Sequence, residues 1–414
     1  MQRIQDRPGA VVLGSDFKAL GVVRSLGRRN IPCIVIDNIP RSAWFSRYVF
    51  RHFKWERAMD DPAFLPFLLK LGEEYRLRQW VLFPMQDEAV TFVACHVPQL
   101  APMYRLVTQE WEIVRLANDK RQTYRLAQEV GVPYSRTCYP HSEEDLAEME
   151  VSFPVIIKPA ISTRLQYAMR LKALTARNRE ELRSQYRLAA SVMPPEEIMV
   201  QEIIPGDGRT QFSVAAFCRD GHILTGMTAR RTRQYPIDYG LGSSFVQAIE
   251  VPPLFDLAKK LLLSMRVCGM VEVEFKRDLR DGHYKLLDIN LRPWGWHTLC
   301  IACGLDFPYI QYCDAQEMIP ETATMPGAPF YGRYWVRLLT DLPAGLQEIR
   351  AGITTPGAYL RSLLGKATFS VFDWRDPLPA LGDVTVALSR LLRGFSRKEA
   401  KADEPLLQSH VSQV

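Results

Sequence analysis

The sequence lacks any apolar run long enough to cross a bilayer. Runs such as residues 11–13 and 261–263 are short, whereas a spanning helix needs roughly 20 apolar residues. The N-terminal stretch carries charges at Arg3 and Asp6 and has neither the apolar region nor the small-residue cleavage site of a secretory signal. We therefore expect a cytoplasmic protein without stable membrane insertion.

Two further absences narrow the choice of partners and cofactors. The net charge of +6 is modest for 414 residues, and the basic residues do not gather in one stripe, so nucleic-acid binding is not expected. Eight cysteines include one C-x-x-C pair, Cys300 and Cys303, but no second pair or histidine pair completes a zinc set. The cysteines are expected to be reduced, and Cys300 and Cys303 are expected to pack in a helix.

What the sequence does have is the composition of a globular protein, with 47% hydrophobic and 24% charged residues. Its length predicts two or three domains. Strand-like runs at residues 10–13, 33–36 and 80–83, with helical spacing over 17–26, predict an open parallel α/β sheet for residues 1–115. No G-x-G-x-x-G follows the first strand, yet such a sheet still offers a ligand crevice at its carboxyl edge.

A second, α+β module is expected from about residue 116. Two hairpins are predicted there, because Asp220-Gly221 and Asp281-Gly282 each join two strand-like runs. The other expected elements are helices at 119–130 and 254–265 and strands at 155–158 and 198–201. Beyond residue 325 the pattern fades, and the polar stretch from about 397 is expected to be a disordered tail.

The second hairpin carries the most informative polar side chains. Glu274 ends one of its strands, and Asp288 and Asn290 lie two residues apart on the other, so that both point to one face. Two carboxylates and an amide oxygen are hard ligands suited to Mg²⁺. Because carboxylates this close repel each other unless a cation lies between them, a merely solvated face is disfavoured.

Cations occur at matching places in the pattern. Lys158 follows the apolar run 155–157, where a buried charge needs an anionic partner such as a polyphosphate. Taken alone, a solvated lysine at a strand end explains this position equally well. Arg292 follows the predicted ligands directly and can hold a phosphoryl group through its fork of donors. Arg231 and Arg233 leave the first hairpin and are candidates for the same anions, although a solvated basic loop explains them nearly as well.

Taken in order, these residues resemble the signature of the ATP-grasp superfamily. The matching elements are Lys120 in Asn-Asp-Lys, Lys158 in Phe-Pro-Val-Ile-Ile-Lys-Pro, Gln201-Glu202 before a turn, Glu274 in Gly-x-x-x-x-Glu-Phe, and Asp288-x-Asn290-x-Arg292. The chain looks most like the bacterial carboxylate-amine ligases, and it is similar to D-aspartate ligases and to the carbamoyl-phosphate synthetase large subunit. The resemblance covers roughly residues 5–320.

The resemblance implies a fold in three parts. A Rossmann-like α/β domain at 1–115 would precede an α+β ATP-grasp module of two subdomains, a small lid at 116–205 and a metal and catalytic part at 206–325. Residues 326–414 would form a C-terminal extension.

It also implies roles for individual residues. Lys120 and Lys158 would contact ATP phosphates, and Arg292 would stabilise an acyl phosphate with help from Arg231 and Arg233. Two Mg²⁺ ions, with Mn²⁺ as the alternative, would be held by Glu274, Asp288 and Asn290. The adenine would lie against Gln201, Glu202, Ile203 and Ile204. The segment after Lys158 lacks the glycines that cover the phosphates in many members, so Ser162 and Thr163 are the candidates for that task.

The function expected is therefore that of an ATP- and Mg²⁺-dependent ligase, in which an amine captures a carboxylate activated as an acyl phosphate. Its partners would be a small carboxylate and an amine, and the sequence leaves a homodimer open. Two alternatives remain: an enzyme that activates bicarbonate, as carboxylases and carbamoyl-phosphate synthetases do, and a nucleotide-binding regulator without turnover. Asp16 and Asp87 could read a substrate, with helix capping as the competing explanation.

Overall fold

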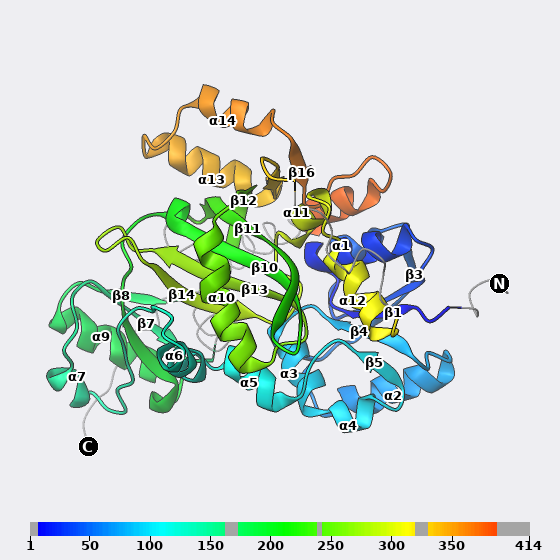
Figure 1. Ribbon diagram of the computed structural model, residues 1–414, viewed down its shortest axis with the longest axis horizontal. Helices are drawn as coiled ribbons and strands as arrows, with labels where there is room; N and C mark the ends of the chain where they lie inside the picture. The colour runs from blue at the N-terminus through cyan, green and yellow to red at the C-terminus, as the bar shows by residue number, and fades with distance from the viewer. Residues whose placement is uncertain (1–6, 162–172, 238–241, 319–329, 387–414) are drawn as a thin grey trace, which may run out of the picture.

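The described residues of the protein fold as three β-sheets with helices packed on them, as the computed structural model shows (Figure 1). The structure describes residues 7–161, 173–237, 242–318 and 330–386. No helix in these ranges combines the length and the apolar character that a membrane span requires.

The first sheet is parallel throughout and has the order β3-β2-β1-β4-β5. Its strands are β1 (Ala10–Leu13), β2 (Cys33–Asp37), β3 (Val49–Lys54), β4 (Trp80–Pro84) and β5 (Tyr104–Leu106). Its helices are α1 (Phe17–Gly27), α2 (Phe64–Glu74), α3 (Asp87–Cys95) and α4 (Val97–Leu100). Because the chain order reverses between β1 and β4, a crevice opens at their carboxyl ends, as in other doubly wound sheets.

A small antiparallel sheet forms a separate lobe, seen at the left of Figure 1. Its order is β6-β9-β7-β8, with β6 (Thr137–Cys138), β7 (Val155–Pro159), β8 (Leu174–Ala176) and β9 (Ile198–Glu202). Helices α7 (Asp145–Glu148) and α9 (Arg179–Ala190) pack on it through a core of their own. Alternation of buried and half-buried residues along β7 leaves Lys158 at the face that is not covered by α9.

The large central sheet has the order β14-β13-β10-β11-β12-β15-β16. Its strands are β10 (Gln211–Arg219), β11 (His222–Tyr235), β12 (Gly242–Ala248), β13 (Gly269–Arg277), β14 (Tyr284–Asn290), β15 (Tyr334–Val336) and β16 (Ala367–Phe369). Both expected hairpins are present: Asp220 and Gly221 turn with positive φ between β10 and β11, and Gly282 does so between β13 and β14. α5 (Trp111–Asn118), α6 (Lys120–Glu129) and α10 (Pro252–Met265) accompany this sheet.

The elements that follow β14 connect the central sheet to the first domain. β15 and β16 extend the central sheet, α13 (Leu338–Arg350) packs against β11, and α14 (Pro356–Leu363) follows it. α11 (His297–Ala302) buries Cys300, while α12 (Phe307–Ala315) returns to the first domain and contributes Tyr312 to its core. The tail expected from residue 397 lies outside the described residues.

Candidate active site

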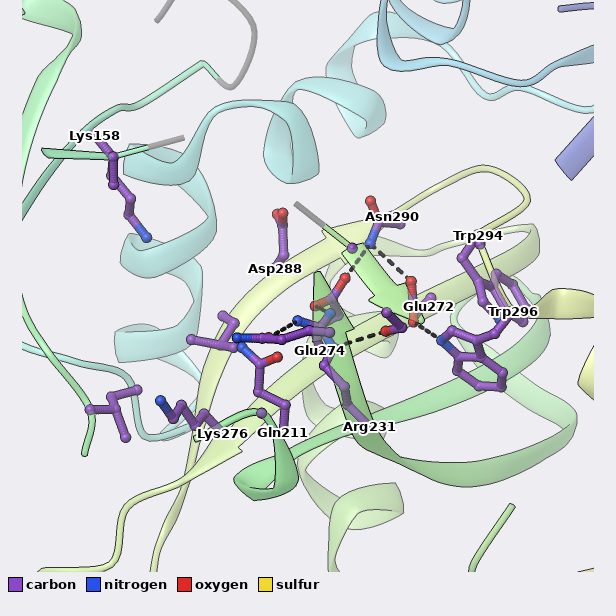
Figure 2. A pocket seen from close by; sticks show the side chains of 18 of the residues that line it. Lys158, Gln211, Arg231, Glu272, Glu274, Lys276, Asp288, Asn290, Trp294 and Trp296 are labelled. Carbon is purple, nitrogen blue, oxygen red and sulfur yellow. Dashed lines mark hydrogen bonds and ion pairs between the residues drawn. The ribbon is translucent and has the colours of Figure 1, made fainter. Parts of the chain in front are cut away.

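A cavity of about 880 Å³ opens where the three sheets meet. Its walls come from the carboxyl ends of β1 and β4, from the small sheet, and from one face of β13 and β14. Figure 2 shows Lys158 on one side of this space and Glu272, Trp294 and Trp296 on the other. The expected residues that line it are Lys120, Lys158, Ile203, Ile204, Arg231, Glu274, Asp288, Asn290 and Arg292.

An acidic group occupies the floor of the cavity. Strands β13 and β14 pair so that Glu274 lies opposite Asp288 and Glu272 opposite Asn290. Residues two apart on a strand share a face, so all four side chains point the same way. The sequence prediction for Glu274, Asp288 and Asn290 is thus matched by their placement on one face.

Glu272 completes this group and was not selected from the sequence. It is 4% exposed and accepts hydrogen bonds from Trp296 Nε1 at 2.7 Å and from Asn290 Nδ2 at 3.1 Å. The same amide nitrogen lies 3.2 Å from Glu274 Oε1. Burial, and secondly the charge of Glu274, raise the pKa of Glu272 well above its usual range. Ionisation of every carboxyl in the group is therefore unfavourable without a cation, and a bound cation would favour it.

The donor set fits Mg²⁺ in its usual protein environment. No three His, Cys, Asp or Glu side chains among the described residues are arranged to hold a metal by themselves. Mg²⁺, however, usually takes only one or two carboxylates from the protein and completes its shell with substrate phosphates and water. Both hydrogen-bonded glutamates contact the amide nitrogen of Asn290, which leaves its oxygen as the remaining ligand.

The lysines stand around this floor. Lys120 Nζ donates to Asp288 Oδ1 at 2.8 Å, and although burial by itself lowers the pKa of Lys120, Asp288 raises it overall. Lys158 Nζ lies 3.5 Å from Tyr124 Oη and 5.8 Å from the centre of the same ring. A third lysine, Lys276, also lines the cavity and donates to Gly206 O at 2.7 Å.

Of the two arginines expected to leave the first hairpin together, only Arg231 reaches the cavity. Its Nη2 lies 3.5 Å from Glu274 Oε2, and its Nε donates to Ser243 Oγ at 2.8 Å. Arg233 is instead 5% exposed and forms a two-bond ion pair with Asp341 of α13 at 2.9 and 2.8 Å. The expected catalytic role of Arg233 is therefore corrected to a structural one, because a register shift between the two positions turns it toward α13.

Arg292 lies between the acidic floor and the first domain. It donates to both carboxylate oxygens of Asp87, from Nε at 2.6 Å and from Nη2 at 3.0 Å. Burial by itself raises the pKa of Asp87, but Arg292 outweighs it and holds that pKa at about 2. Asp87 is the first residue of α3, whose N-cap is Gln86, whereas Asp16 does cap α1 by accepting from Lys18 N and Ala19 N. The capping explanation thus holds for Asp16 and fails for Asp87.

The four residues proposed for the adenine divide into two pairs. Ile203 and Ile204 line the cavity. The side chain of Gln201 is instead buried within the small sheet, where it donates to Thr137 Oγ1 at 2.7 Å, and Glu202 accepts from Ser152 N at 2.8 Å. Their side chains are therefore not part of the cavity wall. Ser162 and Thr163 lie outside the described residues.

Comparisons with known proteins agree with this architecture. No protein family model matches the chain. D-aspartate ligase of Enterococcus faecium is 24% identical over 299 residues, which cover 68% of this chain and 70% of that protein. Carbamoyl phosphate synthase large chain of Methanosarcina mazei is 23% identical over 194 residues, which cover 44% of this chain and 17% of that protein.

Solved structures show the same fold at lower identity. L-amino acid ligase from Bacillus licheniformis aligns with a TM-score of 0.60 at 14% identity, over 79% of this chain and 78% of its own. The biotin carboxylase domain of 2-oxoglutarate carboxylase from Hydrogenobacter thermophilus, solved with MgADP and bicarbonate, aligns with a TM-score of 0.60 at 14% identity, over 75% and 70%. The resemblance to the ATP-grasp carboxylate-amine ligases is thereby confirmed, and the fold is theirs.

Proposed function

We propose that this chain is an ATP- and Mg²⁺-dependent ligase that activates a carboxylate as an acyl phosphate and joins it to an amine. One observation carries the proposal. Glu272, Glu274, Asp288 and Asn290 share one strand face at the floor of a nucleotide-sized cavity, with lysines of two other elements around it. Acidic oxygens and surrounding ammonium groups together suit a metal-bound triphosphate.

In this proposal the walls have separate tasks. Lys120 and Lys158 hold the ATP phosphates, while Ile203 and Ile204 provide an apolar surface for the adenine. Residues 116–205 act as the lid over residues 206–325, and the first domain supplies the carboxylate site. The MgADP complex of the carboxylase domain supports ATP and Mg²⁺ as the cofactors.

Glu274, Asp288 and Asn290 would hold two Mg²⁺ ions, or Mn²⁺ in their place. Bound there, the metal neutralises the phosphate oxygens as charge shifts during transfer. Asp288 would exchange its ion pair with Lys120 for the metal, which frees that lysine for a phosphate. Arg292 and Arg231 would hold the oxygens of the acyl phosphate. No covalent intermediate on the protein is needed, since positioning and charge neutralisation suffice for this chemistry.

An ADP-release assay with a panel of carboxylates and amines tests the proposal. ADP that appears only when both an acid and an amine are present supports the ligase. ADP release with bicarbonate alone would select the carboxylase alternative, and ATP binding without turnover would select the regulator.

Two variants give the assay a matched control. Glu274→Gln keeps the shape of the side chain but removes a ligand charge, so ADP release should fall by at least about 100-fold. Glu56→Gln makes the same change at an exposed residue that pairs with Lys54, and it should leave the rate unaltered.

A further inference from the structure

The first domain contributes one wall of the cavity, and this wall carries both positively and negatively charged side chains. Asp16 and Lys18 follow β1, Asp87 follows β4, and Arg292 reaches them from the end of β14. All four line the cavity, and the charge of Lys18 interacts with those of the other three. They therefore form one mixed cluster at the crevice where the strand order reverses, the usual ligand position in such sheets.

Each charge in this cluster is matched by one opposite charge. Lys18 Nζ lies 3.4 Å from Asp16 Oδ2, and Arg292 binds both oxygens of Asp87. Only 14% of the Lys18 side chain, 18% of the Asp16 side chain and 16% of the Arg292 side chain are exposed, whereas 42% of the Asp87 side chain is exposed. The wall is thus neutral overall but presents two separate cations and two separate anions.

This balance restricts the ligand. A ligand with one charge would pair with one member of the cluster and leave that member's partner without its counter-charge, which is costly where that partner is one of the three members with little exposure. A ligand that carries an ammonium and a carboxylate can replace both kinds of contact at once. Trp294, which is 1% exposed on the same wall, also has an indole Nε1 that meets no acceptor within the described ranges.

We propose that this wall binds an α-amino acid as a zwitterion, with its ammonium at Asp16 and Asp87 and its carboxylate at Lys18 and Arg292, and that this carboxylate is the one activated. The assignment rests on the proposed ligase function. The position of Arg292 determines which end of the ligand faces the acidic floor. This residue lies two positions after Asn290 of that floor, and its planar guanidinium group matches a carboxylate. The ammonium then points away from the floor, toward the first domain.

The chemistry can be followed without knowing the natural amine. A carboxylate oxygen attacks the γ-phosphorus of ATP, the bond to the bridging oxygen breaks, and ADP leaves. Hydroxylamine, supplied as a small nucleophile, then attacks the acyl carbon; phosphate leaves, a proton is lost to solvent, and an amino-acyl hydroxamate remains. Hydroxamate formation therefore reports which acid was activated.

The first test compares amino acids with acids that lack only the amino group. The pairs are alanine and propionate, aspartate and succinate, and phenylalanine and 3-phenylpropionate, with the remaining amino acids tested as both enantiomers. We expect at least one amino acid to yield hydroxamate with a kcat/KM at least about tenfold above that of its deaminated partner. If the best acid in the panel reacts equally well without its amino group, the zwitterion site is wrong although the ligase stands.

A variant separates recognition from folding. Asp16→Asn keeps the side-chain oxygen that caps α1 but removes the charge that would face the ammonium. We expect KM for the amino acid to rise about tenfold, with no rise in KM for the deaminated acid, whereas Glu56→Gln should change neither. An equal rise for both acids would reduce Asp16 to a structural role and overturn the proposal. If no acid of any kind yields hydroxamate or ADP, the ligase function itself has failed.

Discussion

Glu272 stands out among the individual residues because it is an acid buried beside another acid. Its carboxylate is surrounded by the indole of Trp296 and the amide of Asn290, and Glu274 follows two residues later on the same face. Hydrogen-bond donors favour the charged form, but burial and the second carboxylate outweigh them and raise the pKa of Glu272. The ligand-free protein should consequently be strained at this point when the pH is high.

The pH dependence of stability tests this strain. Since the folded state keeps a proton on Glu272 that the unfolded state releases above its ordinary pKa of 4.5, the free energy of unfolding should fall as the pH rises from there. Relative to Glu272→Gln, the wild type should lose at least about 1 kcal/mol between pH 5 and 9 in EDTA. Urea titrations across this range measure it, and saturating Mg²⁺ with ADP should reduce the loss. Parallel pH profiles for both proteins would contradict the idea.

For His297 we predict the opposite pH dependence of the free energy of unfolding. It is fully buried, and burial lowers its pKa to about 4 from 6.5. Between these values the unfolded chain binds a proton that the folded protein excludes, so the free energy of unfolding should fall as the pH drops from 6.5 to 4. The wild type should lose roughly 3 kcal/mol more than His297→Gln over this window. The same urea titrations, run at acid pH, provide the measurement, and an equal loss in the variant would argue against His297.

Some residues of the candidate site could be predicted from the sequence, and others could not. Glu274, Asp288 and Asn290 could be predicted because a strand period of two and a hairpin turn fix their common face. Glu272 lies two residues before Glu274 and therefore shares its face of the strand, so the strand period also indicated Glu272. In the sequence, however, Glu272 resembles an interior position of the strand. Arg233 could not be placed, since a register shift in β11 leaves no mark in the local pattern.

At the scale of elements, α1 and α11 approach unusually closely. Gly21 lies inside α1, and a Cβ atom added there would come within 2.3 Å of His297 Nε2 and 2.6 Å of Thr298 Cγ2. In an exposed helix, replacing glycine by alanine is stabilising by about 0.5–1 kcal/mol. Here the close packing should reverse that sign, because α11 would have to move.

Gly21→Ala should therefore destabilise the protein by about 1–3 kcal/mol, the usual cost of overpacking. Gly357→Ala is the matched control, since Gly357 lies in α14 and its added Cβ meets nothing within 4 Å. That control should be neutral or slightly stabilising. Thermal unfolding of both variants decides the matter, and equal melting temperatures would show that α1 and α11 can separate without cost.

Elements with local signals were predicted well, and elements defined by distant pairing were not. The turn sequences at Asp220-Gly221 and Asp281-Gly282 identify two hairpins, and the helical spacing over 254–265 identifies α10. In contrast, β15 and β16 are three-residue strands that extend the central sheet from a part of the chain where the pattern had faded. Strands this short gain their stability from pairing with partners far away in sequence, which no local window contains.

For the whole molecule, the segment after residue 330 connects the layers. On one side Asp341 of α13 binds Arg233 of the central sheet. On the other side Asp376, which is 1% exposed, accepts from Arg24 Nε at 2.9 Å and Ser46 Oγ at 2.7 Å in the first domain. The position of the first domain over the cavity thus depends on buried charges near the end of the described chain.

Asp376→Ala should weaken this connection strongly. The substitution leaves Arg24, whose side chain is 9% exposed, without its carboxylate, and breaking one side of a buried pair costs about 3–5 kcal/mol. Asp373→Ala removes a neighbouring partner of Arg28, but that pair is 36% and 25% exposed and should be worth no more than about 1 kcal/mol. Calorimetry should show a lower melting temperature for Asp376→Ala, with the first domain unfolding before the central sheet. If both variants melt alike in a single transition, the buried pair does not couple the domains, and their mutual position must depend on α12 and the apolar core instead.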